Sequence, residues 1–245
     1  MSMFDEEAGN QLHNGSKNQF MTPKRVEMSI EWTDSSPSTF QRIVLGTEHY
    51  SNALVDFLLK ELSQGSGQLF GNIVGKEEDS KKATYGTIWG SQSAGQSIGF
   101  IKLEKSFFGY ERILNVLKQL FTSSTQQTVI LHFLPRPGVN ALHRISSGEP
   151  GVLTSVALLP VGEIVNHHFT ASLLNFSQGR SFQTHALVGI ANPDNFTAFA
   201  ELLENSLQQT RAFLSLESAK ALRADKESMD HIRSIVFASA SPLYL

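Results

Sequence analysis

The stretch from residue 151 to residue 191 (GVLTSVALLPVGEIVNHHFTASLLNFSQGRSFQTHALVGIA) is the longest apolar and β-branched-rich region of the chain, and it constrains the fold most. Its apolar runs are separated by Pro, Gly, Asn and Ser, a pattern typical of strands joined by turns. It therefore predicts paired strands within a sheet. A helix is expected directly after it, with Asn192 as N-cap and Pro193 at the first helical position.

Histidine is concentrated in or just before this stretch, which holds five of the eight: His132, His143, His167, His168 and His185. If residues 164–176 form a strand, the two-residue period directs His167 to the apolar side. The same period directs His168 to a polar side with Asn, Thr and Ser. A polar strand face of this kind either lines a cleft or is the solvated side of a sheet.

The N-terminal half alternates between strand and helix patterns. Its periodicity predicts strands at 26–32 and 39–46, a helix capped by Ser51, strands at 67–75, 83–90 and 97–104, a helix at 110–121, and a strand at 128–135. The ββαβββα order from residue 26 to residue 121 resembles that of small domains of the profilin, longin and roadblock kind. Domains of that kind mostly serve as binding or dimerising platforms, but the likeness is one of element order and concerns the type of fold. We expect an α+β protein with a largely antiparallel sheet and helices packed on one face.

The domain organisation follows from changes in composition along the chain. Residues 1–24 are polar and lack periodicity, so we expect a disordered arm. Residues 25–135 are predicted to form an α+β subdomain, and an irregular segment at 136–150 separates it from a second one at 151–245. The second subdomain is expected to contain hairpin strands and then two helices, the last at about 216–236. The alternative is one continuous domain.

A short sequence similarity, which we call the sequence echo, relates the two halves of the chain. Phe40-Gln41 and Phe182-Gln183 each precede a predicted strand, a glycine and a helix. The sequence leaves open whether this is a true repeat.

Composition excludes several functions. The chain has 20 Lys and Arg against 23 Asp and Glu, a net charge of −3, and no basic cluster, which argues against nucleic-acid binding. It has no cysteine, so disulfides, thiolate metal sites and cysteine nucleophiles are absent. No apolar run reaches the roughly 18 residues of a membrane span. We expect a cytoplasmic protein, and export without a cleavable signal stays open.

Short motifs that would identify a cofactor or a catalytic centre are missing. Residues 71–77 (GNIVGKE) have three residues between the glycines, where a phosphate-binding loop needs four, and Glu77 occupies the place of the hydroxyl. Neither Gly-x-Ser-x-Gly nor a zinc-type His spacing occurs. The nearest candidate for a reactive loop is Ser147-Gly148-Glu149 beside His143 and Arg144. No metal and no cofactor are expected, and the catalytic residues, if any, are unknown.

The C-terminal residues 237–245 (FASASPLYL) are apolar and follow the last charge, Arg233. Such a segment either packs on the sheet or contacts a partner. The first hypothesis is a non-enzymatic interaction protein, an adaptor or an assembly or regulatory subunit, which binds a partner or itself through this segment. The second is a hydrolase or transferase that uses dispersed residues, with His168, Glu163 and Arg136 as the first substitutions. The third is a small-molecule-binding domain with a pocket beneath the glycine-rich strands.

Overall fold

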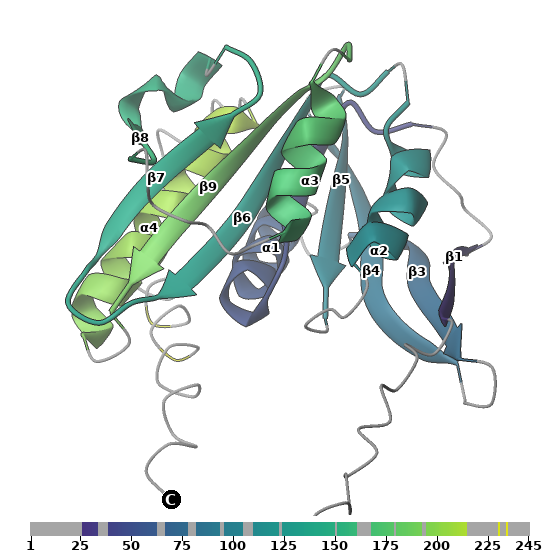
Figure 1. The fold of residues 1–245 in the computed structure, drawn as a ribbon, viewed down its shortest axis with the longest axis horizontal. Coiled ribbons are helices and arrows are strands. Elements are labelled where there is room, and N and C mark those ends of the chain that lie inside the picture. The colour runs from purple at the N-terminus through teal and green to yellow at the C-terminus, as the bar shows by residue number, and fades with distance from the viewer. Residues whose placement is uncertain are drawn as a thin grey trace, which may run out of the picture.

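A nine-stranded mixed sheet organises the part of the chain that the structure describes (Figure 1). The computed structural model describes residues 26–33, 39–62, 67–77, 82–93, 96–104, 110–122, 124–149, 151–160, 168–178, 180–192 and 195–214, with positions 230 and 234. The expected N-terminal arm, the apolar segment 237–245 and, apart from those two positions, the expected last helix lie outside these ranges.

The elements follow the chain in an order that confirms the predicted ββαβββα pattern. The strands are β1 (Val26–Trp32), β2 (Arg42–Gly46), β3 (Gln68–Glu77), β4 (Ala83–Ser93), β5 (Gln96–Leu103), β6 (Gln127–Pro135), β7 (Ala141–Ser146), β8 (Ala157–Leu158) and β9 (Gln183–Ala191). The α-helices are α1 (His49–Leu62), α2 (Tyr110–Leu117), α3 (His168–Ser177) and α4 (Phe196–Phe213), with 3₁₀ helices η1 (Lys118–Leu120) and η2 (Gly151–Ser155).

The sheet has a parallel centre and antiparallel sides. Its order is β1-β3-β4-β5-β2-β6-β9-β7-β8, and the central strands β5, β2, β6 and β9 run parallel. The hairpins β3–β4 and β4–β5, the pair β1–β3 and the pair β7–β9 are antiparallel. Parallel neighbours need long crossover connections, and helices supply them here. The antiparallel character expected from the sequence therefore holds from β1 to β5 and between β7 and β9, whereas the centre and the edge pair β7–β8 are parallel.

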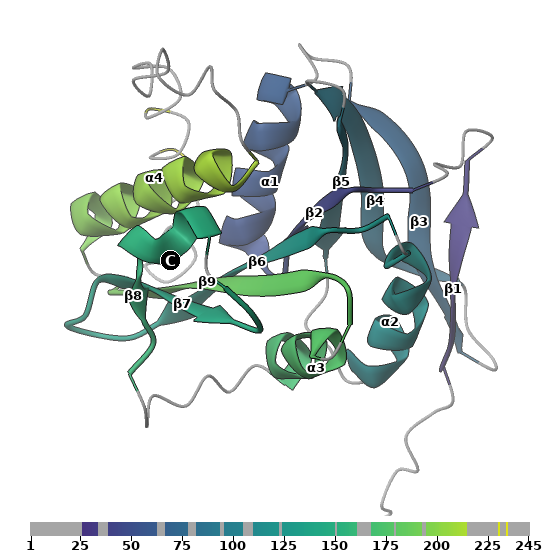
Figure 2. The ribbon, with the colours of Figure 1, turned by 90° about the horizontal axis from the view of Figure 1, so that it is seen from above.

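Helices cover both faces of the sheet, whereas the sequence suggested one face. Figure 2 shows α1 and α4 on one side of the strands and α2 and α3 on the other. The reason lies in the central strands, whose side chains are buried in both directions. In β2, Val44 packs with α1 and α4, while Ile43 and Leu45 pack with α2 and α3. A strand that is apolar on both faces needs cover on both faces.

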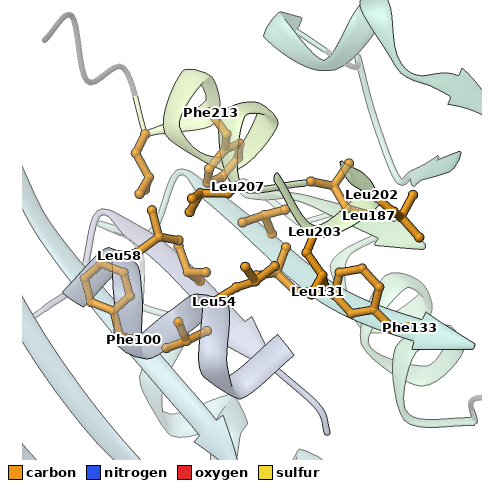
Figure 3. Packing of buried hydrophobic residues seen from close by; sticks show 14 of the residues in the cluster. Leu54, Leu58, Phe100, Leu131, Phe133, Leu187, Leu202, Leu203, Leu207 and Phe213 are labelled. Carbon is orange, nitrogen blue, oxygen red and sulfur yellow. The ribbon is translucent and has the colours of Figure 1, made fainter. Parts of the chain in front are cut away.

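The larger of the two cores fills the space between the sheet and the pair α1 and α4 (Figure 3). Leu54 and Leu58 from α1 meet Leu203 and Leu207 from α4 above the central strands, and none of the four is more than 2% exposed. Each such side chain contributes about 1.5–3 kcal/mol when it is fully buried. This packing holds α1 against α4 and both helices against the central strands.

Residues 168–177 form helix α3, so the strand predicted at 164–176 is wrong over the part that is described. Five side chains of α3 are buried, and they recur at the one-, three- and four-residue intervals of a helix face: Phe169, Thr170, Leu173, Leu174 and Ser177. Phe169 and Leu173 fit both periods, which explains the error. His167 and Glu163 lie outside the described residues.

The neighbouring segments need similar corrections. The stretch expected to be irregular, 136–150, contains strand β7, and the expected strand beginning at residue 151 is the 3₁₀ helix η2 followed by the two-residue strand β8. Helix α4 is capped by Asn195, whose side chain accepts a hydrogen bond from the backbone N–H of Ala198 at 3.1 Å. The predicted cap, Asn192, precedes the helix, and its backbone N–H donates to the side chain of Asn140.

The two halves of the sequence echo occupy matching places in the sheet. Strand β2 leads into α1 and β9 leads into α4, and both strands run parallel to β6, which lies between them. Gln126 joins their starts, because its N–H donates to the carbonyl of Gln41 and its own carbonyl accepts from Gln183. Whether the halves share an origin, and whether they fold as separate subdomains, stay predictions. No helix in the described ranges has the length and apolar character needed to cross a membrane.

Candidate functional site

The first of two polar clusters lies where β2 ends beside the middle of β6, and we call Thr47, Glu48, Ser51 and His132 the carboxyl-edge cluster. Gly46 pairs with Leu131, so the next residues, Thr47 and His132, also lie side by side. The Thr47 hydroxyl donates to the Leu131 carbonyl at 3.1 Å and lies 3.1 Å from Nδ1 of His132. His132 is 4% exposed.

Glu48 and Ser51 cap helix α1 reciprocally. The Glu48 carboxylate accepts from the N–H of Tyr50 at 2.8 Å and of Ser51 at 3.2 Å. In return, the Ser51 hydroxyl oxygen accepts from the N–H of Thr47 at 2.8 Å and of Glu48 at 3.0 Å. This is a capping box in which the acid stands at the cap and the serine stands three residues later, the reverse of the usual order. Ser51, the predicted N-cap, is therefore the second partner of the cap.

Burial raises the pKa of the Glu48 carboxyl above its ordinary value. Hydrogen bonds from Ser51, Tyr50 and the backbone of Phe133 oppose that rise. The carboxyl ends of parallel strands are a common place for ligands in α/β sheets, and carboxyls with raised pKa values are common in active sites. Here, however, the carboxylate oxygens are engaged by backbone donors of the protein itself.

The second polar cluster, which we call the His185 cluster, consists of Arg144, Ser146 and His185 beneath α4. Nδ1 of His185 lies 3.0 Å from the Ser146 hydroxyl, and its ring meets the edge of Phe213 at 6.1 Å between centroids. Burial lowers the pKa of His185, and the positive charge of Arg144 lowers it further. The guanidinium of Arg144 is itself fixed, because its Nε donates to the carbonyl of Val156 at 2.8 Å. The contact between Ser146 and His185 therefore joins β7 to β9, and the bond from Arg144 joins β7 to the segment before β8.

His132 and His185 lie on opposite faces of the sheet. His185 pairs with Val129, which packs with α1 and α4, whereas His132 pairs with Val188, which packs with α2 and α3. Register partners on neighbouring strands share a face. These two histidines therefore cannot act on one ligand. His168 begins α3, and only its backbone is described.

The loop after β7 does not assemble the groups that a serine nucleophile needs. The Ser147 hydroxyl oxygen accepts from the N–H of Thr184 at 3.0 Å and lies 2.9 Å from the Ser177 hydroxyl, which donates to the Leu174 carbonyl at 2.7 Å. It thus joins α3 to β9. His143 and Arg144 are consecutive in β7 and point to opposite faces. Arg136 lies after β6, and its backbone N–H donates to the carbonyl of Ala191.

Aromatic rings fill the space beside two glycines of the glycine-rich strands. A Cβ at Gly90 would lie 1.9 Å from the ring of Phe70, and a Cβ at Gly99 would lie 2.8 Å from the ring of Phe40. The glycines there make room for side chains of the protein, which weakens the case for a ligand pocket at these strands. Within the described ranges, no group of three or more His, Asp and Glu side chains is arranged to hold a metal ion.

Large apolar side chains are exposed at the two edges of the sheet. Val152 in η2 is 53% exposed and Leu158 in β8 is 61% exposed, and at the opposite edge Trp32 of β1 is 40% exposed. The apolar C-terminal segment, the contact surface expected from the sequence, lies outside the described residues. Sequence periodicity alone did not identify the exposed edges, because exposure of an edge strand depends on which strand has no neighbour.

No protein-family model and no curated protein matches this chain. Its fold is similar to that of PbaA from Pyrococcus furiosus, an archaeal homolog of proteasome-assembly chaperone. The monoclinic crystal form gives a TM-score of 0.54 at 15% identity over 89% of this chain and 100% of PbaA. A second PbaA structure gives 0.52 at 16% identity over 85% and 100%. A Thermoplasma acidophilum protein of unknown function gives 0.55 at 10% identity over 85% and 88%. At these identities the likeness concerns the fold.

Proposed function

We propose that this chain is a non-enzymatic protein-binding factor that assists the assembly of a multi-subunit complex. The observation that carries this proposal is the likeness to PbaA, which extends over 89% of this chain and the whole of PbaA. A match over both lengths includes the parallel centre and the antiparallel sides together. It is therefore stronger support than a shared helix-and-sheet core would be, although fold alone does not determine function.

The polar clusters support the same proposal. Glu48 and Ser51 cap α1, and Thr47 joins His132 to the Leu131 carbonyl. His185 and its neighbours join β7 to β9 and α4. A structural role accounts for each of these groups, since buried polar atoms need partners whether or not they act on a substrate.

The alternative, an enzyme, draws on Glu48. Its raised pKa at the carboxyl edge of parallel strands is a feature that favours acid–base chemistry. A general acid must reach a substrate, whereas this carboxylate is held by the helix that it caps. We therefore place the assembly role first.

The partner class that we propose is a free subunit of the proteasome core, and the contact that we propose is the apolar segment 237–245. The test mixes the purified full chain with separate core subunits from the same source and measures mass by size-exclusion chromatography with light scattering. We expect a stoichiometric complex with free subunits. We expect no complex when residues 237–245 are replaced by nine Gly and Ser residues.

The Gly/Ser variant keeps the length of the chain and all of the described residues, so it serves as a matched control for the fold. Its circular dichroism spectrum should equal that of the wild type. If the wild type forms no complex at about 50 μM of each protein, a concentration well above the Kd of a specific protein complex, the assembly role is refuted. If the Gly/Ser variant binds as well as the wild type, the segment is not the contact.

A further inference from the structure

The outer edge of β1 is unpaired among the residues that the structure describes (Figures 1 and 2). Its inner edge pairs with β3 in antiparallel register, and the N–H of Thr33 continues that ladder by donating to the Phe70 carbonyl at 2.8 Å. Hydrogen-bonded positions alternate along an antiparallel strand. Glu27, Ser29 and Glu31 therefore bond inward to β3.

The backbone N–H and C=O groups of Met28, Ile30 and Trp32 consequently point outward. Three consecutive outward positions form a template for another extended chain, because only a strand offers donors and acceptors at the same spacing. Natural edge strands usually avoid such pairing by being short or by carrying lysine or proline. Strand β1 has seven residues and contains neither.

The side chains of β1 indicate what kind of strand would fit. Glu27, Ser29 and Glu31 are exposed on one face. On the other face, Met28 and Ile30 are half-buried against the core beneath α2 and α3, and Trp32 is 40% exposed. The outer neighbour would thus meet two carboxylates on one face and an apolar border on the other.

On the inner side of β1, lysines already lie beside both of its glutamates. Lys76 of β3 is the register partner of Glu27, and Lys82, which precedes β4, forms an ion pair with Glu31. Both lysines approach from the β3–β4 side. Opposite charges on neighbouring strands stabilise pairing, so basic residues on an outer strand would complete a basic–acidic–basic row.

A second copy of this chain fits the edge poorly in the register that pairs the most residues of β1. Val26 is a fourth outward position, and the antiparallel register that uses all four of them places Met28 opposite Ile30 of the other copy. That register also places Glu27 directly opposite Glu31, twice, in a non-hydrogen-bonded pair with Cα atoms about 4.5 Å apart. Like charges directly opposite each other destabilise a strand pair. The acids therefore disfavour self-pairing in this register.

We propose that the outer edge of β1 binds an extended segment of a partner protein in which basic and apolar residues alternate. The segment adds a tenth strand to the sheet, with its basic residues beside Glu27 and Glu31 and its apolar residues beside Trp32. This inference rests on the proposed protein-binding function, and it specifies a second contact, separate from residues 237–245.

The test uses the full chain and a fluorescent seven-residue peptide of alternating Lys and Val, followed by fluorescence anisotropy. A Glu/Val peptide of the same length is the control ligand. We expect the Lys/Val peptide to bind and the Glu/Val peptide to show no binding at 1 mM. In the Glu27→Lys/Glu31→Lys variant we expect the affinity for the Lys/Val peptide to fall about tenfold, since two favourable charge pairs become repulsive.

Two further variants separate the edge from general charge effects. Glu201→Lys changes an exposed acid on α4 and should leave the affinity unchanged. Met28→Pro removes an outward N–H and keeps the inward bonds to β3, so it should abolish binding in a chain whose circular dichroism is unchanged.

Equal peptide affinity in wild type and Glu27→Lys/Glu31→Lys would overturn the inference, and so would no binding of the Lys/Val peptide at 1 mM. A wild-type dimer that Met28→Pro converts to a monomer would also overturn it, because a second copy would then occupy the edge. These outcomes leave the proteasome-subunit assay unaffected, so the two proposals can fail separately.

Discussion

The ion pair between Arg211 of α4 and Glu61 of α1 offers a quantitative test of how the two helices are held together. Oε2 of Glu61 accepts from Nε of Arg211 at 3.0 Å and also lies 3.0 Å from Nη2. The Arg211 side chain is 3% exposed and that of Glu61 is 17% exposed. The guanidinium also lies 5.5 Å from the centre of the Phe57 ring. Oε1 of Glu61 is buried and has no hydrogen-bond partner among the described residues.

Removing one partner leaves the other charge buried without compensation. We expect Arg211→Met to lower the free energy of unfolding by about 3 kcal/mol, the low end of the range for broken buried pairs, because Glu61 keeps some contact with water. Glu61→Leu should cost about 4 kcal/mol, since the stranded guanidinium is almost fully buried. The double variant replaces both charges by apolar groups, so we expect it within about 1 kcal/mol of the wild type.

The assay is urea unfolding of the four proteins, followed by circular dichroism at constant pH and salt. In thermal unfolding the single variants should melt about 6–16 °C lower than the wild type, given about 2–4 °C per kcal/mol for a chain of this size. A double variant as unstable as the sum of its singles would refute the reasoning, because the two charges would then not compensate each other. Singles within about 0.5 kcal/mol of the wild type would do the same.

Three further predictions concern single residues. The pKa of Glu48 is higher in the folded chain than its ordinary 4.5, so protonation stabilises the folded form. Relative to Glu48→Gln, we therefore expect the free energy of unfolding of the wild type to fall as pH rises above 4.5. Urea unfolding from pH 4 to 8 measures it. The pKa of His185 is lowered from 6.5, so burial favours its neutral form. Relative to His185→Gln, the wild type should lose stability as pH falls below 6.5. Parallel curves of unfolding free energy against pH for the two proteins would contradict the burial of this imidazole. Gly189→Ala would place a Cβ 2.3 Å from the buried ring of Phe133 and should cost about 1–3 kcal/mol in thermal unfolding, whereas Gly148→Ala, 3.2 Å from a flexible Gln183, should be nearly neutral.

Sequence periodicity correctly predicted the strands that have a clear alternating pattern or a continuous apolar run. The alternation of residues 26–32 predicted β1, and the apolar run from 128 predicted β6, which is buried between β2 and β9. It failed at α3, where Phe169 and Leu173 fit a strand as well as a helix. It also failed at β7, whose partly exposed residues have no long apolar run, because that strand is stabilised by pairing with β9.

The candidate site depended even more on tertiary contacts. The sequence singled out histidines and a serine loop by residue type, and it could not say which faces they occupy. The bonds from Tyr50 and Ser51 to Glu48 are local, whereas the bonds from Phe133 to Glu48 and from Thr184 to Ser147 come from partners that strand order brings close. The raised pKa of Glu48 likewise arises from burial at the end of β2. The cap formed by Glu48 and Ser51 has a local signal in the chain, whereas the burial of Glu48 and the contacts of Ser147 have none.

The sequence by itself determined the local elements of the N-terminal half, the lack of cysteine chemistry and the small net charge of −3, because these follow from composition and from the spacing of neighbouring residues. The tertiary structure alone decided that β2, β6 and β9 run parallel with helices on both faces. It therefore also decided that His132 and His185 lie on opposite sides and that, among the described residues, the outer edge of β1 has no neighbouring strand. Strand order is set by long-range burial and backbone pairing, and no local sequence pattern encodes which strand lies beside which.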